Sequence, residues 1–590
     1  MACKSIYPQI FSAAQRSTAA KVYFANSPTQ KLAEFFEAKG LLALKQEDQR
    51  EQWCADWLSY QATHGLYAAV LKPQQDADGG FGLNVLNYAR FLEVFAYYSP
   101  AHGYSLQVTS LGLFSILLGT NPELKQEALA ALEQGDLLAF GVSEKDHGSD
   151  LLANGFTIRD LGAGRFLAHG KKYYIGNANA ASIISTLAHE EDGRTNGSAR
   201  RSVPILFALR PKQSKNFAVK KIRTLGVRGA FVGDFEVKDH EFPASDMIAR
   251  GRDAWDAVFG AVTLGKFFLN FGSIGICEHA LAEASEHLSQ RVLYGKPAIE
   301  MPHLRIAMAQ AYARLTAMKL YAYRALDYVN SASAHDRRYV LYCAVQKAKV
   351  STEGVKVMAQ LSECIGAKGF EAETYFEMAL RDVQLFPGLE GSTHINLAMT
   401  AQFIPCYFDR VDPKIVNPKS LANTPQASGG NPYLFGARSG GINTIAFPDH
   451  LKSYAPLMAI PNVRLFAKQA KAFELFARKH AAESAPEKNM QVNLLLGQGL
   501  AMITYGQLIA ENAVHFEVPA QMVSTIFHLL VNDLTSAMIA VISSGQFDAA
   551  AMKLLERRGV AVPKTAAADW DFLAIRMQKF EPRMNTDEHR

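Results

Sequence analysis

A single carboxylate in a tight bend is the residue of this sequence best placed to do chemistry. Glu390 lies in the stretch Leu380 to Asn396, which reads L-R-D-V-Q-L-F-P-G-L-E-G-S-T-H-I-N. The Pro-Gly pair at 387–388 stops the preceding helix, and Ser392 or Thr393 is a good N-cap for the apolar helix that follows. Glu390 is therefore expected between two helices, beside a glycine that lets another molecule approach the backbone. A carboxylate held there among apolar neighbours could act as a base.

The carboxyl group of Glu390 is expected to be harder to ionise than that of a free glutamate. Leu389 and a bound apolar ligand would desolvate it and raise its pKa above the free value of about 4.3. Such a shift moves the group towards useful basicity at neutral pH. A helix that begins at Ser392 opposes the shift, because its N-terminus stabilises negative charge. The sequence leaves open which effect is larger.

Length, charge and cysteine pattern set limits on the class of protein. The chain has 590 residues, 49% of them hydrophobic, with a net charge of +5 spread along its length. This length predicts three or four domains, and dispersed charge argues against a nucleic-acid partner. Six scattered cysteines without a C-x-x-C motif predict a reducing compartment and no structural metal. No run of ~18 uncharged apolar residues occurs, so no integral membrane segment is expected.

Hydrophobic periodicity and turn residues divide the chain into helical and β regions. The predicted fold class is α+β, mostly α. Long helices are expected at Phe267–Gln290, His303–Val329 and Arg337–Cys364, and again at Leu451–Glu483, Asn489–Phe516 and Ala520–Ser544. The predicted regions are an N-terminal arm (1–30), a helical domain (31–136), a β domain of sandwich or barrel type (137–248), a four-helix bundle (249–408), a Pro- and Gly-rich linker loop (409–450) and an appended helical domain (451–590).

Four ordered segments resemble the acyl-CoA dehydrogenase family, and together they cover roughly residues 30 to 408. Besides the Glu390 stretch they are F-G-V-S-E-K-D-H-G-S-D at 140–150 with H-G-K-K-Y-Y-I-G-N at 169–177, R-V-L-Y-G-K-P at 291–297 and E-C-I-G-A-K-G-F at 363–370. The resemblance implies an N-terminal helical domain, a middle β domain and a C-terminal four-helix bundle. The long form of the family adds a further helical domain.

The resemblance also implies a reaction, the FAD-dependent conversion of an acyl-CoA thioester to the trans-2-enoyl-CoA, as in fatty acid β-oxidation. In the family the glutamate takes the α proton while flavin N5 takes the β hydride. The glutamate's backbone N–H and a flavin ribose hydroxyl bind the thioester oxygen. Some relatives place the base on another helix, at a position that is Gly265 here. Because glycine cannot act as a base, Glu390 is the expected catalytic residue.

The family's binding positions are carried over one by one. Arg291 and Tyr294 resemble the pair that reaches the flavin pyrophosphate across a dimer interface, where the planar arginine fork suits phosphate. Glu363 stands where many relatives have glutamine. Ser149, Leu389 and Gly391 are expected to contact substrate, and Lys171, Lys172, Lys220 and Lys221 to be solvated surface charges. The expected FAD-binding residues are Phe140, Val142, Ser143, Gly148, Ser149, Tyr174, Ile175, Gly176, Arg291, Tyr294, Glu363, Ala367, Ser392 and His394.

Gly176 keeps a second activity open. Many members have Thr or Ser there, whose hydroxyl meets flavin N5, whereas acyl-CoA oxidases tend to have glycine, which could open a path for dioxygen. The favoured interpretation is a dehydrogenase that passes electrons to an electron-transfer flavoprotein. The alternatives are an oxidase, a dehydrogenase acting on a carrier-protein-bound acyl group, and a nucleic-acid-protecting or structural relative that keeps FAD but lacks turnover. The expected assembly is a homodimer, with the appended domain covering the surface that a second dimer would use. The expected location is the cytoplasm, ahead of the mitochondrial matrix.

Overall fold

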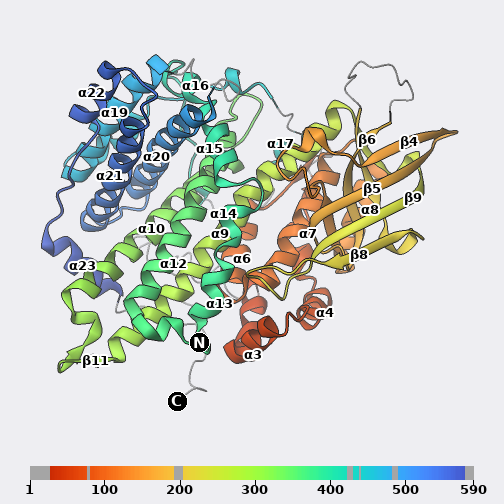
Figure 1. Ribbon diagram of the computed structural model, residues 1–590, viewed down its shortest axis with the longest axis horizontal. Coiled ribbons are helices and arrows are strands. Elements are labelled where there is room, and N and C mark those ends of the chain that lie inside the picture. Colours follow the sequence, from red (N-terminus) through yellow and green to blue (C-terminus); the bar gives the residue numbers. More distant parts are fainter. Residues whose placement is uncertain are drawn as a thin grey trace.

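The computed structural model describes residues 27–75, 80–191, 203–421, 430–436, 440–480 and 489–577. Most of the predicted N-terminal arm and residues 422–429 and 437–439 of the predicted linker lie outside these ranges. Figure 1 shows the strands at one side of the molecule, the long helices in the centre and the C-terminal helices at the other side.

The helices between residues 28 and 133 join the strands to the long central helices. Helix α7 is buried along almost its whole length, because it packs against α9 on one side and β3 on the other. A Cβ at Gly112 would lie 2.7 Å from the carbonyl oxygen of Ala139, so glycine lets α7 approach the strand closely. The elements are α3 Pro28–Gln49, α4 Ala55–His64, α5 Leu66–Leu71, β1 Gln74–Gln75, β2 Phe81–Gly82, α6 Val85–Tyr98, α7 Pro100–Leu118 and α8 Pro122–Glu133.

The described strands of the β region form one eight-stranded sheet. Its order is β10-β7-β6-β4-β5-β9-β8, and β3 pairs with β6 in parallel. The β-type runs that the sequence predicts, at 138–143, 165–175, 182–188, 203–209 and 231–237, each overlap a strand, but the sequence missed β4, β8 and β10. The bounds are β3 Leu137–Gly141, β4 Thr157–Gly162, β5 Arg165–Gly176, β6 Ala181–Glu190, β7 Pro204–Leu209, β8 Phe217–Lys221, β9 Val232–Pro243 and β10 Met247–Arg250, with the short η1 Leu151–Ala153, η2 Pro211–Gln213 and η3 Ala244–Asp246 between them.

Helices α9, α10 and α12 are the long members of the central bundle. Helix α9 begins at Arg252, well before the predicted start at Phe267, because its N-terminal third is also apolar and packs on the sheet. The predicted helix from Arg337 is split by a π-helical segment, η5. The bounds are α9 Arg252–Gln290, β11 Val292–Leu293, β12 Lys296–Pro297, η4 Ala298–Glu300, α10 Pro302–Asn330, α11 Tyr339–Val345, η5 Gln346–Val350, α12 Ser351–Ile365, η6 Gly366–Phe370, α13 Tyr375–Asp382, α14 Leu385–Gly388, α15 Thr393–Ala401 and α16 Ile404–Phe408.

The C-terminal helices pack together beside the bundle. The predicted helix from Leu451 breaks after one turn, because prolines at 456 and 461 restrict the backbone and remove N–H donors. The sequence missed α22 and α23. The bounds are α17 Tyr433–Gly436, η8 Ile442–Thr444, α18 Leu451–Tyr454, η9 Ala455–Leu457, α19 Pro461–His480, α20 Met490–His515, α21 Ala520–Ser543, α22 Ala549–Arg558 and α23 Ala567–Met577.

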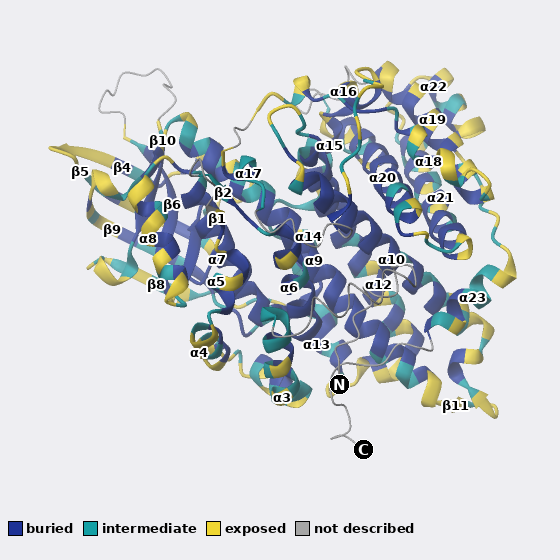
Figure 2. Ribbon diagram, turned by 180° about the vertical axis from the view of Figure 1, so that it is seen from behind, coloured by how far each residue is buried: buried dark blue, intermediate teal, exposed yellow. Residues whose placement is uncertain are grey.

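Helix α20 is the main contact between the appended helices and the bundle, and Figure 2 shows it as a mostly buried element. It packs on α10 and α15. Gly497 faces the backbone carbonyl of Leu397, where a Cβ would collide with the oxygen, so glycine permits the close approach. The sequence predicts a broad apolar face on this helix, formed by Val492, Leu494, Leu495, Leu496, Leu500, Met502 and Ile503. All of these are buried except Leu494 and Leu495, which are partly exposed.

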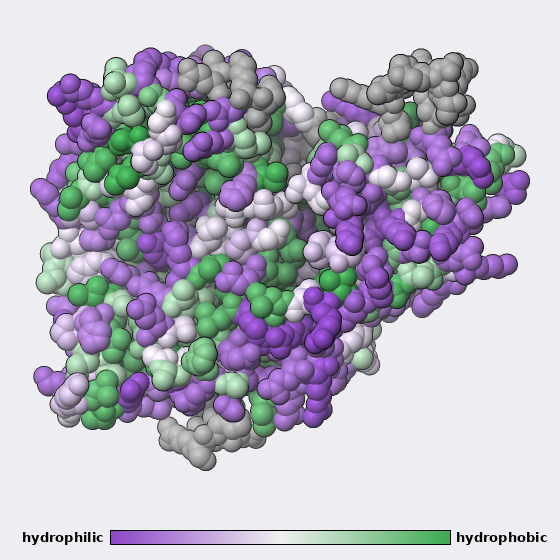
Figure 3. All heavy atoms as spheres, in the orientation of Figure 1, coloured by the Kyte–Doolittle hydropathy of each residue, from purple (hydrophilic) through white to green (hydrophobic). Residues whose placement is uncertain are grey.

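The expectation that no helix could span a membrane is not supported by length and composition. Helices α9, α20 and α21 are each long and apolar enough to cross a membrane. In their most apolar 18-residue stretches, 78%, 83% and 56% of the stretch is buried inside the protein. Packing against neighbouring helices explains much of this apolar character. On the face drawn in Figure 3, hydrophobic side chains are interspersed with hydrophilic ones.

Candidate active site

Glu390 occupies a turn that the surrounding residues fix in an unusual conformation. Helix α14 ends at Gly388, and Glu390 and Gly391 follow with φ of 56° and 82°, in the left-handed region. A non-glycine residue there is uncommon and marks a site held by its surroundings. The amide Nδ2 of Asn396 donates to the carbonyls of Gly391 (2.9 Å) and Ser392 (3.0 Å), which fixes the turn. Ser392 is the N-cap of α15, as predicted, but without a side-chain cap bond.

The polar groups of Glu390 are left available. Within the described part of the chain, its carboxylate accepts no hydrogen bond and its backbone N–H donates none. The side chain retains some exposure, although protein atoms surround it closely. An acceptor and a donor thus lie on one residue of a fixed turn, ready for a bound molecule.

Burial raises the pKa of Glu390 to about 7, and Lys347 and Lys266 oppose that rise without cancelling it. The sequence predicted the desolvation but named a helix N-terminus as the opposing group. The structure adds two buried ammonium groups as further opposing charges. A base with a pKa near 7 is matched to proton abstraction at neutral pH.

The two lysines come from different helices and were not singled out from the sequence. Lys347 lies in the π-helical segment η5, is fully buried, and donates to the carbonyl oxygen of Phe386 in α14. Lys266 lies in α9, and its Nζ is 3.5 Å from the sulfur of Met399. Burial lowers the pKa of both groups, that of Lys347 to about 7. π-helical segments occur often at functional sites, and that is the signal that could have directed attention to Lys347.

The space that a side chain on Gly176 would need is filled by protein atoms. A Cβ on Gly176 would lie 2.5 Å from Cγ2 of Val108 and 2.7 Å from Cε1 of Tyr104. The hydroxyl of Tyr104 makes no hydrogen bond among the described residues, and the ring lies within electrostatic range of Glu390. Tyr104 is thus a further residue of the site that sequence reasoning missed.

Gly265 has no room for a side chain either. A Cβ there would collide with Leu111, and the carbonyl oxygen of Gly265 accepts a 2.9 Å hydrogen bond from Nε2 of Gln107. The alternative position for a base is therefore closed by packing as well as by the absence of a functional group.

One group of predicted flavin residues lies along the end of the sheet nearest α7. Phe140, Val142 and Ile175 are buried, and the hydroxyl of Ser143 donates to the carbonyl of Tyr173. Tyr174 has φ of 63° and is 55% exposed, so one side of its ring is open. Gly148 and Ser149 lie in the exposed loop after β3. Ser392 and the exposed His394 lie at the start of α15.

A second group lies at the end of the bundle and is not brought together with the first within one chain. Arg291 and Tyr294 lie at the β11–β12 hairpin, and both Arg291 and Lys368 influence the pKa of His287. Glu363 and Ala367 are exposed at the same end. The side chain of Arg291 has no ion-pair partner among the described residues, and Tyr294 is 97% exposed.

Of the lysines expected to be solvated, Lys172 is not. It is fully buried and forms a 2.8 Å ion pair with Glu144, because the β5 backbone directs it under the loop after β3. Burial lowers its pKa to about 8. Lys221 donates to the carbonyls of Glu51 and Arg228.

Comparison with known proteins agrees with this fold. Residues 139–240 match the acyl-CoA dehydrogenase middle domain, and residues 254–404 match the acyl-CoA dehydrogenase C-terminal domain. An acyl-CoA dehydrogenase of Bacillus subtilis (strain 168) is 27% identical over 346 residues, which are 58% of this chain and 87% of the relative.

Two solved structures show how far the fold extends. A Bacillus anthracis acyl-CoA dehydrogenase complexed with FAD aligns with 97% of this chain and 96% of its own, at a TM-score of 0.72 and 17% identity. A prolyl acyl carrier protein oxidase aligns with 67% of this chain and 99% of its own, at a TM-score of 0.56 and 19% identity. The alignment with the first structure includes the appended helices. The alignment with the second covers about two thirds of this chain.

The two matched domains, a helical N-terminal region and a glutamate in a left-handed turn define a flavoprotein dehydrogenase fold. The chain matches two domain models of the acyl-CoA dehydrogenase family and is similar to proteins of that name, which are oxidoreductases.

Proposed function

We propose that this protein catalyses the FAD-dependent α,β-dehydrogenation of an acyl-CoA thioester, with Glu390 as the base that removes the α proton. The observation that carries the proposal is a desolvated carboxylate with a pKa of about 7 and no hydrogen-bond donor from the described residues. A structural glutamate at this depth would be paired, because an unpaired buried charge is costly.

The residues present fit FAD. The unpaired guanidinium of Arg291 and the exposed ring of Tyr294 suit a pyrophosphate, and the open ring of Tyr174 suits a flat aromatic system. Phe140, Val142 and Ser143 would lie along the flavin, with Gly148 and Ser149 beside it. The bound cofactor supplies the acceptor for the β hydride.

The chain's own groups then do the acid–base work. The backbone N–H of Glu390 donates to the thioester carbonyl oxygen, which makes the α proton more acidic. The carboxylate accepts that proton. Lys347 and Lys266 keep enough of the carboxylate ionised at neutral pH, since both lower its pKa. Leu389 and Gly391 flank the base, and Tyr104 lines the side towards Gly176.

We propose a homodimer in which each flavin contacts both chains. Exposed apolar residues support this, since Val292, Tyr294 and Phe370 are 64%, 97% and 93% exposed at the end of the bundle that carries Arg291. The appended helices bury another face of α10, which argues against a second dimer on that face.

Buried thiols at the described cysteines support a reducing compartment such as the cytoplasm.

An electron-transfer flavoprotein is the proposed electron acceptor, and dioxygen is the second candidate. The oxidase candidate is favoured by glycine at position 176, but Tyr104 and Val108 occupy the space that glycine leaves. For the same reason, we expect the reduced enzyme to react slowly with air.

Anaerobic reduction with a panel of acyl-CoAs from short to very long, followed by air, tests the proposal. We expect bleaching of the flavin absorbance by a subset of the panel and slow recovery in air. A matching panel of carrier-protein thioesters distinguishes the carrier. Fast recovery with stoichiometric peroxide would establish the oxidase, and no bleaching by any thioester would contradict the proposal.

A further inference from the structure

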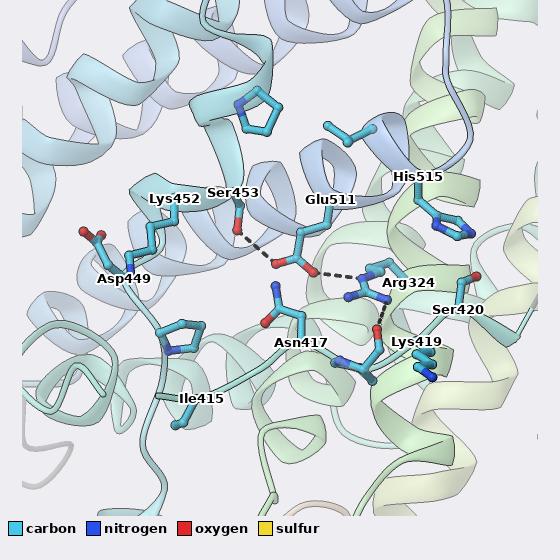
Figure 4. Close-up of a pocket in the computed structure, with 14 residues that line it drawn as sticks. Arg324, Ile415, Asn417, Lys419, Ser420, Asp449, Lys452, Ser453, Glu511 and His515 are labelled. Carbon is cyan, nitrogen blue, oxygen red and sulfur yellow. Dashed lines mark hydrogen bonds and ion pairs between the residues drawn. The ribbon is translucent and has the colours of Figure 1, made fainter. Parts of the chain in front are cut away.

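A cavity of about 740 Å³ lies where the bundle, the linker and the appended helices meet (Figure 4). Arg324 of α10 comes from the bundle, and Asn417, Lys419, Ser420 and Asp449 come from the linker. Helix α18 contributes Lys452 and Ser453, and α20 contributes Glu511 and His515. None of the residues around Glu390 described above lines it, so it is separate from the candidate active site.

The floor of the cavity is an ion pair whose carboxylate is already saturated. Oε2 of Glu511 accepts from Nε of Arg324 (2.8 Å) and from the hydroxyl of Tyr328 (2.9 Å). Oε1 accepts from Ser453 (3.0 Å) and from Gln507 (2.9 Å). With four donors, Glu511 has little remaining capacity to hold a cation in the cavity.

Arg324 keeps one edge unused. Its Nε binds Glu511, and its Nη1 binds Asp327 (2.8 Å) and the carbonyl of Pro418 (3.0 Å). Its Nη2 has no acceptor among the residues that the structure describes. A fixed guanidinium with a free N–H edge is a ready donor for an anionic oxygen.

Further donors line the same cavity. Lys419 and Lys452 are exposed, and their ammonium groups have no acceptor in the described part of the chain. Asn417 receives Nη1 of Arg338 on its Oδ1 (3.1 Å), which leaves its Nδ2 available, and Nε2 of His515 is buried without a partner. The other lining carboxylate, Asp449, accepts from the backbone N–H of Leu451.

We propose that this cavity binds a small anion that carries phosphate or carboxylate groups, held by Arg324, Lys419 and Lys452. Its lining contains no Phe, Tyr or Trp, so no ring is present to stack a nucleotide base. The three cations belong to the bundle, the linker and the appended helices. A bound anion therefore joins the three parts and stabilises their packing by mass action.

Calorimetric titration of the full-length holoenzyme with pyrophosphate and with citrate, at constant ionic strength, tests this site. The variant is Lys419→Ala with Lys452→Ala, which removes two exposed charges without touching the Arg324–Glu511 pair. The matched control is Lys414→Ala with Lys468→Ala, which has the same charge change in the linker and α19 but lies outside the cavity. Flavin absorbance and circular dichroism confirm that both variants are folded.

We expect at least one anion to bind and to raise the unfolding temperature in the wild type and in the control. In the cavity variant, affinity should fall at least ~10-fold, as expected when charge-assisted contacts are lost. Preference for pyrophosphate identifies a phosphate ligand, and preference for citrate identifies a carboxylate ligand. Equal affinity in the cavity variant, or no binding of either anion to the wild type, would overturn the proposal.

Discussion

Two glutamates closely surrounded by protein atoms, the partly exposed Glu390 and the buried Glu353, have opposite electrostatic surroundings in the same helical half of the molecule. Glu390 has no hydrogen-bond partner among the described residues, and burial raises its pKa to about 7. Glu353 accepts from Lys349 (2.9 Å), Lys356 (2.9 Å) and Arg314 (2.6 Å). Burial alone would raise the pKa of Glu353 too, but these three cations lower it far below its usual value.

The difference shows what each glutamate is suited to do. Direct partners keep Glu353 charged at any working pH, so it cannot exchange a proton and serves only to stabilise the fold. Arg314 also binds Asp533 of α21 (2.9 Å), so the Glu353 cluster joins the bundle to the appended helices. Glu390 has cations nearby but none within hydrogen-bonding contact, so its proton can come and go near neutral pH. The number of direct donors, rather than burial, separates a base from a structural charge.

Removing the charge of Glu353 should have the largest effect on stability. Glu353→Gln leaves Arg314, Lys349 and Lys356 with Asp533 as their remaining acid, and we expect a loss of about 3–5 kcal/mol in the free energy of unfolding. The loss should be full at pH 7 and shrink below pH 4.5, where the unfolded glutamate is protonated as well. Denaturant unfolding measures it. The control is Glu371→Gln, an exposed pair with Lys368 that should cost under about 1 kcal/mol. Equal losses would contradict the structural role of the cluster.

Removing the charge of Glu390 should stabilise the protein, whereas removing that of Glu353 should destabilise it. Because its folded pKa of about 7 exceeds the unfolded value of 4.5, the folded state binds more protons between these values. Stability is therefore lost as pH rises through that window, and the penalty is complete above pH 7. Glu390→Gln should thus gain about 1–3 kcal/mol at pH 8 and nearly nothing at pH 4.5. Thermal unfolding across pH checks this, and a destabilised variant at pH 8 would mean that Glu390 is a structural residue.

Removing one of the cations near Glu390 should have a smaller effect than the two substitutions above. It should shift the pKa of Glu390. Lys266→Met places an apolar side chain where the ammonium contacts mainly the sulfur of Met399. Because Lys266 lowers the pKa of Glu390, its loss should move the acidic limb of the flavin-reduction rate up by about one pH unit. Lys266→Arg keeps the charge and serves as the control. If Lys266→Met leaves the limb unchanged while Lys266→Arg behaves as wild type, the lysine does not tune Glu390.

The sequence predicted the local features of the site better than its long-range ones. The Pro-Gly pair, Gly391 and Ser392 are enough to predict a turn at Glu390, because turn chemistry is local. Lys266 and Lys347 approach Glu390 only through the packing of α9 and η5, and no short motif records that. Likewise, Tyr104 of α7 fills the space beside Gly176, so glycine at this position also meets a packing requirement that the sequence did not reveal.

The succession of helical and β regions was predictable where the hydrophobic pattern extends over many residues. The helical, β and helical succession and the apolar face of α20 follow from periodicity. The prolines at 456 and 461 break a predicted helix although the hydrophobic periodicity continues, because proline restricts the backbone and lacks an N–H donor. The cation-lined cavity at Arg324 depends on a linker that folds back on the bundle, and composition alone describes such a segment only as a loop.

The rate of anaerobic flavin reduction by acyl-CoA in Glu390→Gln tests the central claim most directly. The substitution keeps size and hydrogen bonding but removes the proton acceptor. The account predicts a yellow, folded protein that binds acyl-CoA normally and is reduced at least ~10²-fold more slowly, as is typical when a general base is lost. Near-normal reduction of the flavin in this variant would contradict the assignment of Glu390 as the base.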